Sequence, residues 1–140
     1  MTAFHYEIDF KLKDESKFSD WIDRVIASEN KKGDQIDFIF CDDFYLLNIN
    51  LQYLNHDTFT DIITFDYSSE KAISGDIFIS VDRVQENART HQVEFYNELM
   101  RVMSHGVLHL MGYSDKSEDD VREMRSKEDE KIKLFHVEHL

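Results

Sequence analysis

Two histidines and an aspartate form the part of this sequence best suited to chemistry. His105 and His109 lie in the segment HGVLHLMGYSD, which ends at Asp115. On a helix, residues four apart project from the same face. Gly112 is placed to end such a helix, so the chain can turn back and bring Asp115 to the two imidazoles. These three ligands would leave a fourth tetrahedral position open, as in catalytic zinc sites. We therefore predict a metal site of His105, His109 and Asp115.

The donor types narrow the choice of metal and of reaction. Zinc is the natural metal for two imidazoles and a carboxylate, and we expect one ion per chain. Imidazole also suits nickel, cobalt and iron, so the donors alone leave the metal open. Zinc peptidases with the H-E-x-x-H motif keep a general base directly after the first histidine. Gly106 stands there in this chain, which disfavours a peptidase. The remaining histidines are predicted to be ordinary surface residues: His5, His56, His91, His136 and His139.

The elements that must position this site follow from the hydrophobic pattern. Apolar and polar residues alternate from Phe4 to Lys13, which is typical of a half-buried strand. A helix is predicted from the apolar stripe at Phe18, Trp21, Ile22, Val25 and Ile26. Strands are predicted over 35–42, 61–67 and 76–81, the last two as a hairpin. Further helices are predicted from the stripe Phe44, Leu47, Leu51 and Leu54, capped by Asp42 or Asp43, and over 82–90, over 95–110 and from Ser117 onward.

This order of elements predicts the fold class and the domain organisation. We expect an α+β fold, one domain over residues 1–140, in which helices cover the faces of a four-stranded mixed sheet. The metal site would lie at the end of a central helix. The composition, 41% hydrophobic and 32% charged, is that of a globular domain. No apolar run approaches the roughly 18 residues that a membrane helix needs, and no secretory signal is visible, so we expect a cytoplasmic protein without a membrane partner. A single cysteine, Cys41, fits a reducing compartment.

The charge balance limits the ways in which this chain could bind nucleic acid. Twenty-nine acidic and sixteen basic residues give a net charge of −13, which argues against non-specific binding of a polyanion. A local basic or metal-centred site remains compatible with this charge. The candidates for contacts with phosphate are Arg83, Arg89, Arg101, Lys116 and Arg122.

Three sequence blocks resemble one known family. HGVLHLMGYSD is similar to the motif H-G-x-L-H-L-x-G-Y-D-H of the YbeY-type endoribonucleases, the rRNA maturation factors of bacteria. TDIITF, from Thr60 to Phe65, resembles the family's T-D-V-L-S-F, with Asp57 three residues before Thr60. GDIFIS, from Gly75 to Ser80, is similar to the family's G-D-I-x-I-S strand. The blocks follow the family's order across residues 49–120.

The resemblance implies an activity, a substrate and partners. It implies a single-strand-specific, zinc-dependent endoribonuclease that acts in 16S rRNA 3′-end maturation and in ribosome quality control. The substrate would be an rRNA precursor, and proteins of the small ribosomal subunit would be partners. His105 and His109 carry over as zinc ligands, and Asp115 stands in place of a third histidine. Asp61 and Asp76 are candidates for orienting the histidines by hydrogen bonds, although strand-end aspartates are also common without such a role.

Two further departures from the family pattern support an alternative function. Asn50-Leu51-Gln52-Tyr53 is followed by Leu54, where the family has an arginine, and Phe59 replaces a proline. An arginine there would be expected to hold a phosphate or to stabilise charge in the transition state, which leucine cannot do. The alternative is a non-catalytic binding factor in ribosome assembly with a structural metal, and the net charge of −13 also favours it.

Overall fold

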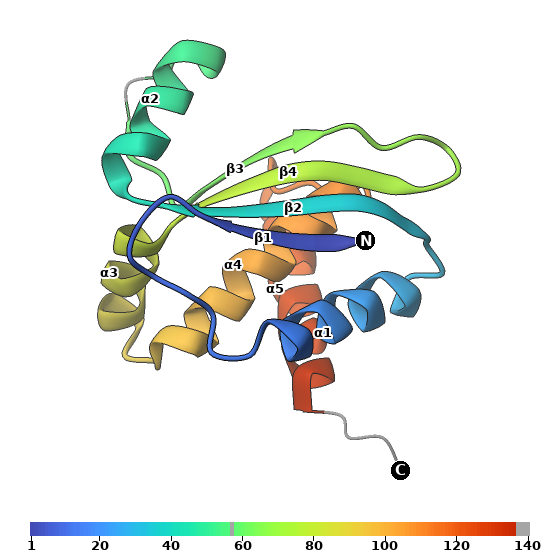
Figure 1. The fold of residues 1–140 in the computed structure, drawn as a ribbon. Helices are drawn as coiled ribbons and strands as arrows, with labels where there is room; N and C mark the ends of the chain where they lie inside the picture. The colour runs from blue at the N-terminus through green and yellow to red at the C-terminus, as the bar shows by residue number, and fades with distance from the viewer. Residues whose placement is uncertain (57, 137–140) are drawn as a thin grey trace.

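A four-stranded mixed sheet forms the centre of the computed structural model, which describes residues 1–56 and 58–136 (Figure 1). The strands are β1 (Thr2–Tyr6), β2 (Gly33–Cys41), β3 (Ile62–Asp66) and β4 (Ile73–Ser80). They lie in the order β1-β2-β4-β3, so β1 and β3 are the two edges. β2 pairs parallel with both β1 and β4, whereas β3 and β4 form the predicted antiparallel hairpin.

Five α-helices are found in the described residues, in the predicted order along the chain. They are α1 (Glu15–Ser28), α2 (Asp43–Leu54), α3 (Val81–His91), α4 (Phe95–Leu110) and α5 (Glu118–Lys133), and a 3-10 turn, η1 (Leu134–His136), follows. In Figure 1, α1, α3, α4 and α5 lie on one face of the sheet and α2 projects from the other. The predicted α+β fold class is therefore confirmed. None of the helices described has the length and apolar character needed to cross a membrane.

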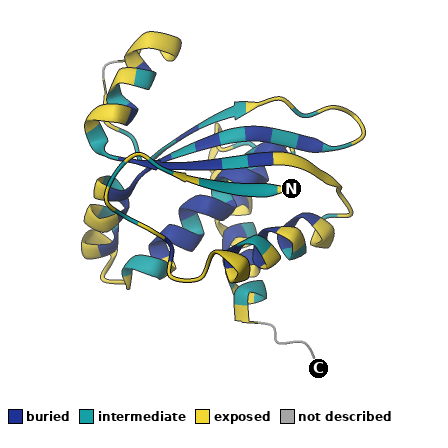
Figure 2. Cartoon of the chain, viewed as in Figure 1, coloured by how far each residue is buried: buried dark blue, intermediate teal, exposed yellow. Residues whose placement is uncertain are grey.

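The main hydrophobic core lies between the sheet and helices α1 and α4, where Figure 2 shows most of the buried residues. The predicted stripe of α1 is buried along its whole length, and Trp21, Ile22 and Val25 are fully inaccessible to solvent. β2 is covered on both faces: Phe38 packs into this core, while Cys41 packs beneath α2. A nearly continuous apolar run is what a strand covered on both sides requires.

The first strand is shorter than the alternation from Phe4 to Lys13 predicts. It ends at Tyr6, which pairs with Phe40, and β2 itself ends one residue further on. The chain therefore has no neighbouring strand to pair with beyond this point. Alternation persists because Ile8 and Phe10 still pack against the core while the backbone crosses toward α1.

The predicted apolar stripe of α2 is not its buried face. Leu46 and Asn50 are buried, whereas Phe44 is 70% exposed and Leu51 and Leu54 are also exposed. Apolar residues occur all round this helix, so periodicity could not select the face that contacts the sheet. The predicted cap is confirmed, because the Asp42 carboxylate accepts a hydrogen bond from the backbone N–H of Tyr45 at 2.8 Å.

Two glycines determine how α4 carries its histidines. A Cβ at Gly106 would lie 2.9 Å from Cγ2 of Ile77 and 3.0 Å from Cδ1 of Ile62, so the absence of a side chain lets α4 lie close to the sheet. Gly112 has a φ of +100°, a conformation that L side chains rarely adopt. It ends the helix as predicted and directs the chain back toward the histidine face.

Candidate metal centre

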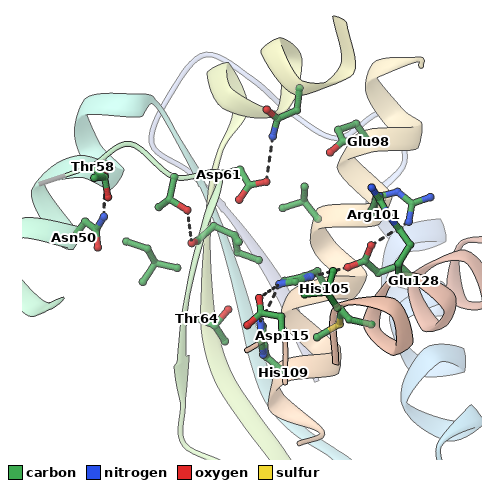
Figure 3. Close-up of a pocket in the computed structure, with 18 of the residues that line it drawn as sticks. Asn50, Thr58, Asp61, Thr64, Glu98, Arg101, His105, His109, Asp115 and Glu128 are labelled. Atoms are coloured by element: carbon green, nitrogen blue, oxygen red, sulfur yellow. Dashed lines mark hydrogen bonds and ion pairs between the residues drawn. The ribbon is translucent and has the colours of Figure 1, made fainter. Parts of the chain in front are cut away.

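The three predicted ligands converge at the end of α4 (Figure 3). The Nε2 atoms of His105 and His109 lie 2.9 Å apart. Oδ2 of Asp115 lies 3.4 Å from Nε2 of His105 and 3.5 Å from Nε2 of His109. The His105, His109 and Asp115 side chains are 22%, 29% and 45% exposed, so the point they face is open to solvent.

Hydrogen bonds behind the two rings aim their Nε2 lone pairs at that point. Nδ1 of His109 lies 2.9 Å from the carbonyl oxygen of Tyr113. A carbonyl oxygen only accepts, so Nδ1 carries the hydrogen and Nε2 keeps its lone pair. Nδ1 of His105 donates in the same way to Oε2 of Glu128 at 2.6 Å. Metal-binding histidines are usually held by such a carboxylate or carbonyl behind the ring.

Glu128 of α5 is the residue of this site that the sequence analysis missed. Its side chain is only 7% exposed, and its other oxygen, Oε1, accepts a hydrogen bond from Arg101 at 3.0 Å. Arg101 also pairs with Asp129 at 2.6 Å. Burial opposes the charge on His105, but the carboxylate of Glu128 raises the pKa of His105. The available signal was spacing: Glu128 follows the buried Met124 by four residues and therefore lies on the inner face of α5.

A cleft of about 810 Å³ opens above the three ligands, along the free edge of the sheet. One wall comes from α2, β3 and the segment that joins them, and the other comes from α4 and α5; α3 also contributes to the lining. The lining includes uncharged polar side chains, apolar side chains and charged ones, among them Asn50, Leu54, Thr60, Asp61, Asn87, Glu98, Arg101 and Arg125. The cleft therefore gives an extended polar ligand access to the histidines.

The family Endoribonuclease YbeY matches this chain over residues 5–136. The chain belongs to the YbeY endoribonuclease family. The Endoribonuclease YbeY of Flavobacterium psychrophilum is 60% identical over 137 residues, which are 98% of each chain. That of Flavobacterium johnsoniae is 57% identical over 138 residues, 99% of each chain. The solved solution structure of a Thermotoga maritima protein matches with a TM-score of 0.68 at 24% identity, over 96% of this chain and 89% of that one, and agrees in fold.

Leu54 and Phe59, which replace the arginine and the proline of the family pattern, lie at or beside the cleft in this YbeY-family chain. Leu54, at the position of the expected arginine, lines the cleft wall. Phe59, in place of the expected proline, is exposed, and its ring lies 5.9 Å from that of Phe44. Asp57, which precedes the second block of the family resemblance by three residues, lies outside the described residues.

The predicted phosphate contacts divide into paired and unpaired cations. Arg101 lines the cleft but is held by Glu128 and Asp129. Three of the other candidates do not line the cleft and form ion pairs elsewhere: Arg83 with Asp43, Arg89 with Glu86, and Arg122 with Asp119. Lys116 is exposed and does not line the cleft. Arg125 was not predicted; it lines the cleft, and among the described residues no ion pair to it is found.

The two aspartates proposed to orient the histidines have other partners in the structure. Asp61 lines the cleft and accepts a hydrogen bond from Nδ2 of Asn87 at 3.2 Å, and burial raises its pKa. Asp76 accepts a hydrogen bond from the hydroxyl of Tyr67 at 3.2 Å and is not among the residues that line the cleft. Glu128 and the carbonyl of Tyr113 hold the rings instead.

The other histidines that the structure describes are exposed, and two of them border the cleft. His56 and His91 line it, and Nδ1 of His91 lies 3.5 Å from Oε1 of Glu98. His5 pairs with Asp37 at 2.8 Å on the first strand pair, and His136 is exposed in η1. His139 lies outside the described residues.

Proposed function

We propose that this chain is a metal-dependent endoribonuclease that cuts single-stranded RNA and holds one zinc ion on His105, His109 and Asp115. One observation carries the proposal: in a chain of the YbeY family, two imidazole nitrogens and a carboxylate oxygen face one solvent-open point, with donor atoms within 4.8 Å of one another. Two histidines and one carboxylate suit zinc and leave room for a further ligand.

In this proposal the protein's residues each have a defined task. Zinc would supply a Lewis acid for the phosphodiester and would activate water at neutral pH. Glu128 and the Tyr113 carbonyl would fix the orientation of the two rings, so that little reorganisation is needed when metal binds. The cleft along β3 would admit the RNA strand, and Arg125 would meet its phosphates, because of the two arginines described in the cleft lining it is the one without a described ion pair.

We propose further that the substrate is an rRNA precursor. The chain would act in 16S rRNA 3′-end maturation and in ribosome quality control, in the cytoplasm and together with proteins of the small ribosomal subunit. Support for these assignments comes from the family resemblance of the three sequence blocks, and for the compartment also from the single cysteine.

The test is cleavage of a 5′-labelled single-stranded RNA by zinc-loaded protein. His109→Ala removes a ligand, and His5→Ala removes a histidine that lies outside the cleft. We expect cleavage by the wild type and by His5→Ala, and none by His109→Ala. Equal cleavage by all three proteins would reveal a contaminating nuclease and contradict the proposal.

The second candidate is a non-catalytic factor in ribosome assembly. The observation that favours it is Leu54 on the cleft wall, where an arginine would face the substrate. Absence of cleavage by a wild type that holds one zinc per chain would favour this candidate over the ribonuclease.

A further inference from the structure

A buried lysine lies behind the candidate metal centre, away from the cleft. The side chain of Lys131 on α5 is 0% exposed. Its ammonium group is 2.7 Å from Oε2 of Glu29, at the end of α1, and 2.8 Å from Oγ of Ser28, and it also pairs with Glu130. All three donors of the ammonium group are therefore satisfied by protein atoms.

Stability alone does not account for a lysine at this position. A buried ion pair loses the hydration of both charges, and well-packed apolar residues of similar volume are often at least as stabilising. Lys131 follows Met124 and Glu128 on the inner face of α5, where an apolar residue would continue the packing. The pair is therefore expected to determine a conformation, as buried polar groups do in some other proteins.

The carboxylate of Glu29 connects this pair to the turn after α4. The hydroxyl of Tyr113 donates to Oε1 of Glu29 at 2.6 Å, and Lys127 donates to Oε2 at 3.2 Å. The ammonium group of Lys127 also lies 5.7 Å from the centre of the Tyr113 ring. The Tyr113 side chain is thus held between the end of α1 and the side of α5.

The backbone of the same tyrosine holds a metal ligand. Its N–H donates to the carbonyl of Leu108 at 3.0 Å, and its carbonyl accepts from Nδ1 of His109 at 2.9 Å. Gly112, with its positive φ, precedes it and leaves this turn with little side-chain support of its own. The direction of the Tyr113 carbonyl therefore depends on where the ring is anchored.

We propose that the ion pair of Glu29 with the buried Lys131 positions the metal ligand His109 by anchoring Tyr113, whose backbone carbonyl fixes the imidazole. Glu29, Lys131 and Tyr113 are positioning residues in this proposal, since none of them belongs to the ligand set. The proposal rests on the metal binding in the proposed function. It adds that Glu29, directly after α1 and outside the cleft lining, helps to set the geometry at the end of α4 through its contacts with α5.

The test is the affinity of the protein for Zn²⁺, measured by competition with a chromophoric chelator, with thermal melting followed in parallel. Tyr113→Phe keeps the ring and removes the hydrogen bond to Glu29. Glu29→Gln keeps a polar side chain and removes the charge. Tyr6→Phe is the matched control, because the Tyr6 hydroxyl makes a similar hydrogen bond to Glu15, at 2.5 Å, outside the cleft.

We expect Tyr113→Phe and Glu29→Gln to weaken Zn²⁺ binding by about 10-fold or more, the usual effect of losing a residue that orients a ligand. Tyr6→Phe should bind Zn²⁺ as the wild type does. Lys131→Met should behave like Glu29→Gln in Zn²⁺ affinity even where its melting temperature stays close to that of the wild type.

Other outcomes overturn the proposal. Variants with lower melting temperatures but unchanged Zn²⁺ affinity would show that the network only stabilises the fold. A wild type that binds no Zn²⁺ would show that His109 is not a metal ligand. The ribonuclease proposal can fail separately. If the variants differ in Zn²⁺ affinity as expected but the wild type cuts no RNA, the result would contradict the ribonuclease activity and still support the positioning of His109.

Discussion

At the scale of single residues, the site depends on groups that touch the ligands from behind. His105 and His109 can each present Nε2 only because another atom occupies Nδ1, the carboxylate of Glu128 in one case and the carbonyl of Tyr113 in the other. Glu128 is in turn held by Arg101, which shares its guanidinium with Asp129. Arg101 therefore pairs with two neighbouring carboxylates: Glu128, which also contacts His105, and Asp129, for which no contact with His105 is described.

Glu128→Gln should therefore weaken the binding of Zn²⁺ by about 10- to 100-fold, because an amide holds the His105 ring less firmly than a carboxylate. Asp129→Asn also perturbs Arg101 but leaves His105 untouched, and we expect it to bind Zn²⁺ normally. Chelator competition measures both affinities. An equal loss in the two variants would assign the effect to Arg101 and not to the contact with His105.

Arg125 should contact the substrate in the proposed reaction. Arg125→Ala removes a positive charge from the cleft, so we expect KM for a single-stranded RNA to rise several-fold while kcat changes little. The slope of log(kcat/KM) against log[salt] should become less steep by about 1, the effect of one lost phosphate contact. Arg122→Ala, whose arginine pairs with Asp119 outside the cleft, is the control. An Arg125→Ala variant with the kinetics of the wild type would exclude this contact.

At the scale of elements, α4 carries two of the three candidate ligands, His105 and His109, and its neighbours fix its place. Gly106 lets α4 approach Ile62 and Ile77 of the sheet, which explains a glycine where a peptidase of the H-E-x-x-H type would have its general base. α5 closes the other side through Glu128 and Met124. Glu29, the residue directly after α1, joins this arrangement through Tyr113 and Lys131.

The contact between α1 and α5 predicts how stability depends on pH. Burial alone would raise the pKa of Glu29, but hydrogen bonds from Lys131, Tyr113 and Lys127 lower it to about 2, from an ordinary value of 4.5. A carboxyl whose pKa is lower in the folded state stabilises the fold at pH above 4.5 and loses that contribution as the pH falls toward 2.

Urea unfolding of the wild type and of Glu29→Gln across this pH range measures the contribution. The difference in free energy of unfolding should be largest above pH 4.5 and should shrink toward pH 2. A difference that stays constant with pH would mean that the Glu29 charge adds nothing to stability.

At the scale of the whole molecule, metal binding should be coupled to folding. The ligands come from α4 and from the loop after it, so the complete site exists only in the folded chain, and binding energy adds to the free energy of unfolding. Removal of the metal with EDTA should lower Tm by roughly 10 °C for a tightly bound ion. EDTA should leave Tm of His109→Ala nearly unchanged, and an equal shift in both proteins would indicate an effect unrelated to this site.

The sequence by itself determined the features that depend on local pattern. The order of the elements, the buried stripe of α1, the cap at Asp42 and the stop at Gly112 all follow from residue types a few positions apart. The grouping of His105, His109 and Asp115 also follows from local pattern, because one helical turn and one glycine turn bring their side chains together.

Only the tertiary structure decided the features that join distant segments. The end of β1 depends on where β2 ends, and the buried face of α2 depends on which side meets the sheet. Glu128 lies 23 residues from His105, and Lys131 lies 102 residues from Glu29. Helical spacing from Met124 places Glu128 and Lys131 on the inner face of α5, but residue type and spacing do not reveal which distant groups they meet. Packing α5 against α4 and the end of α1 gives Glu128 and Lys131 their hydrogen-bond partners, and a buried charge is stable only where the fold supplies such partners.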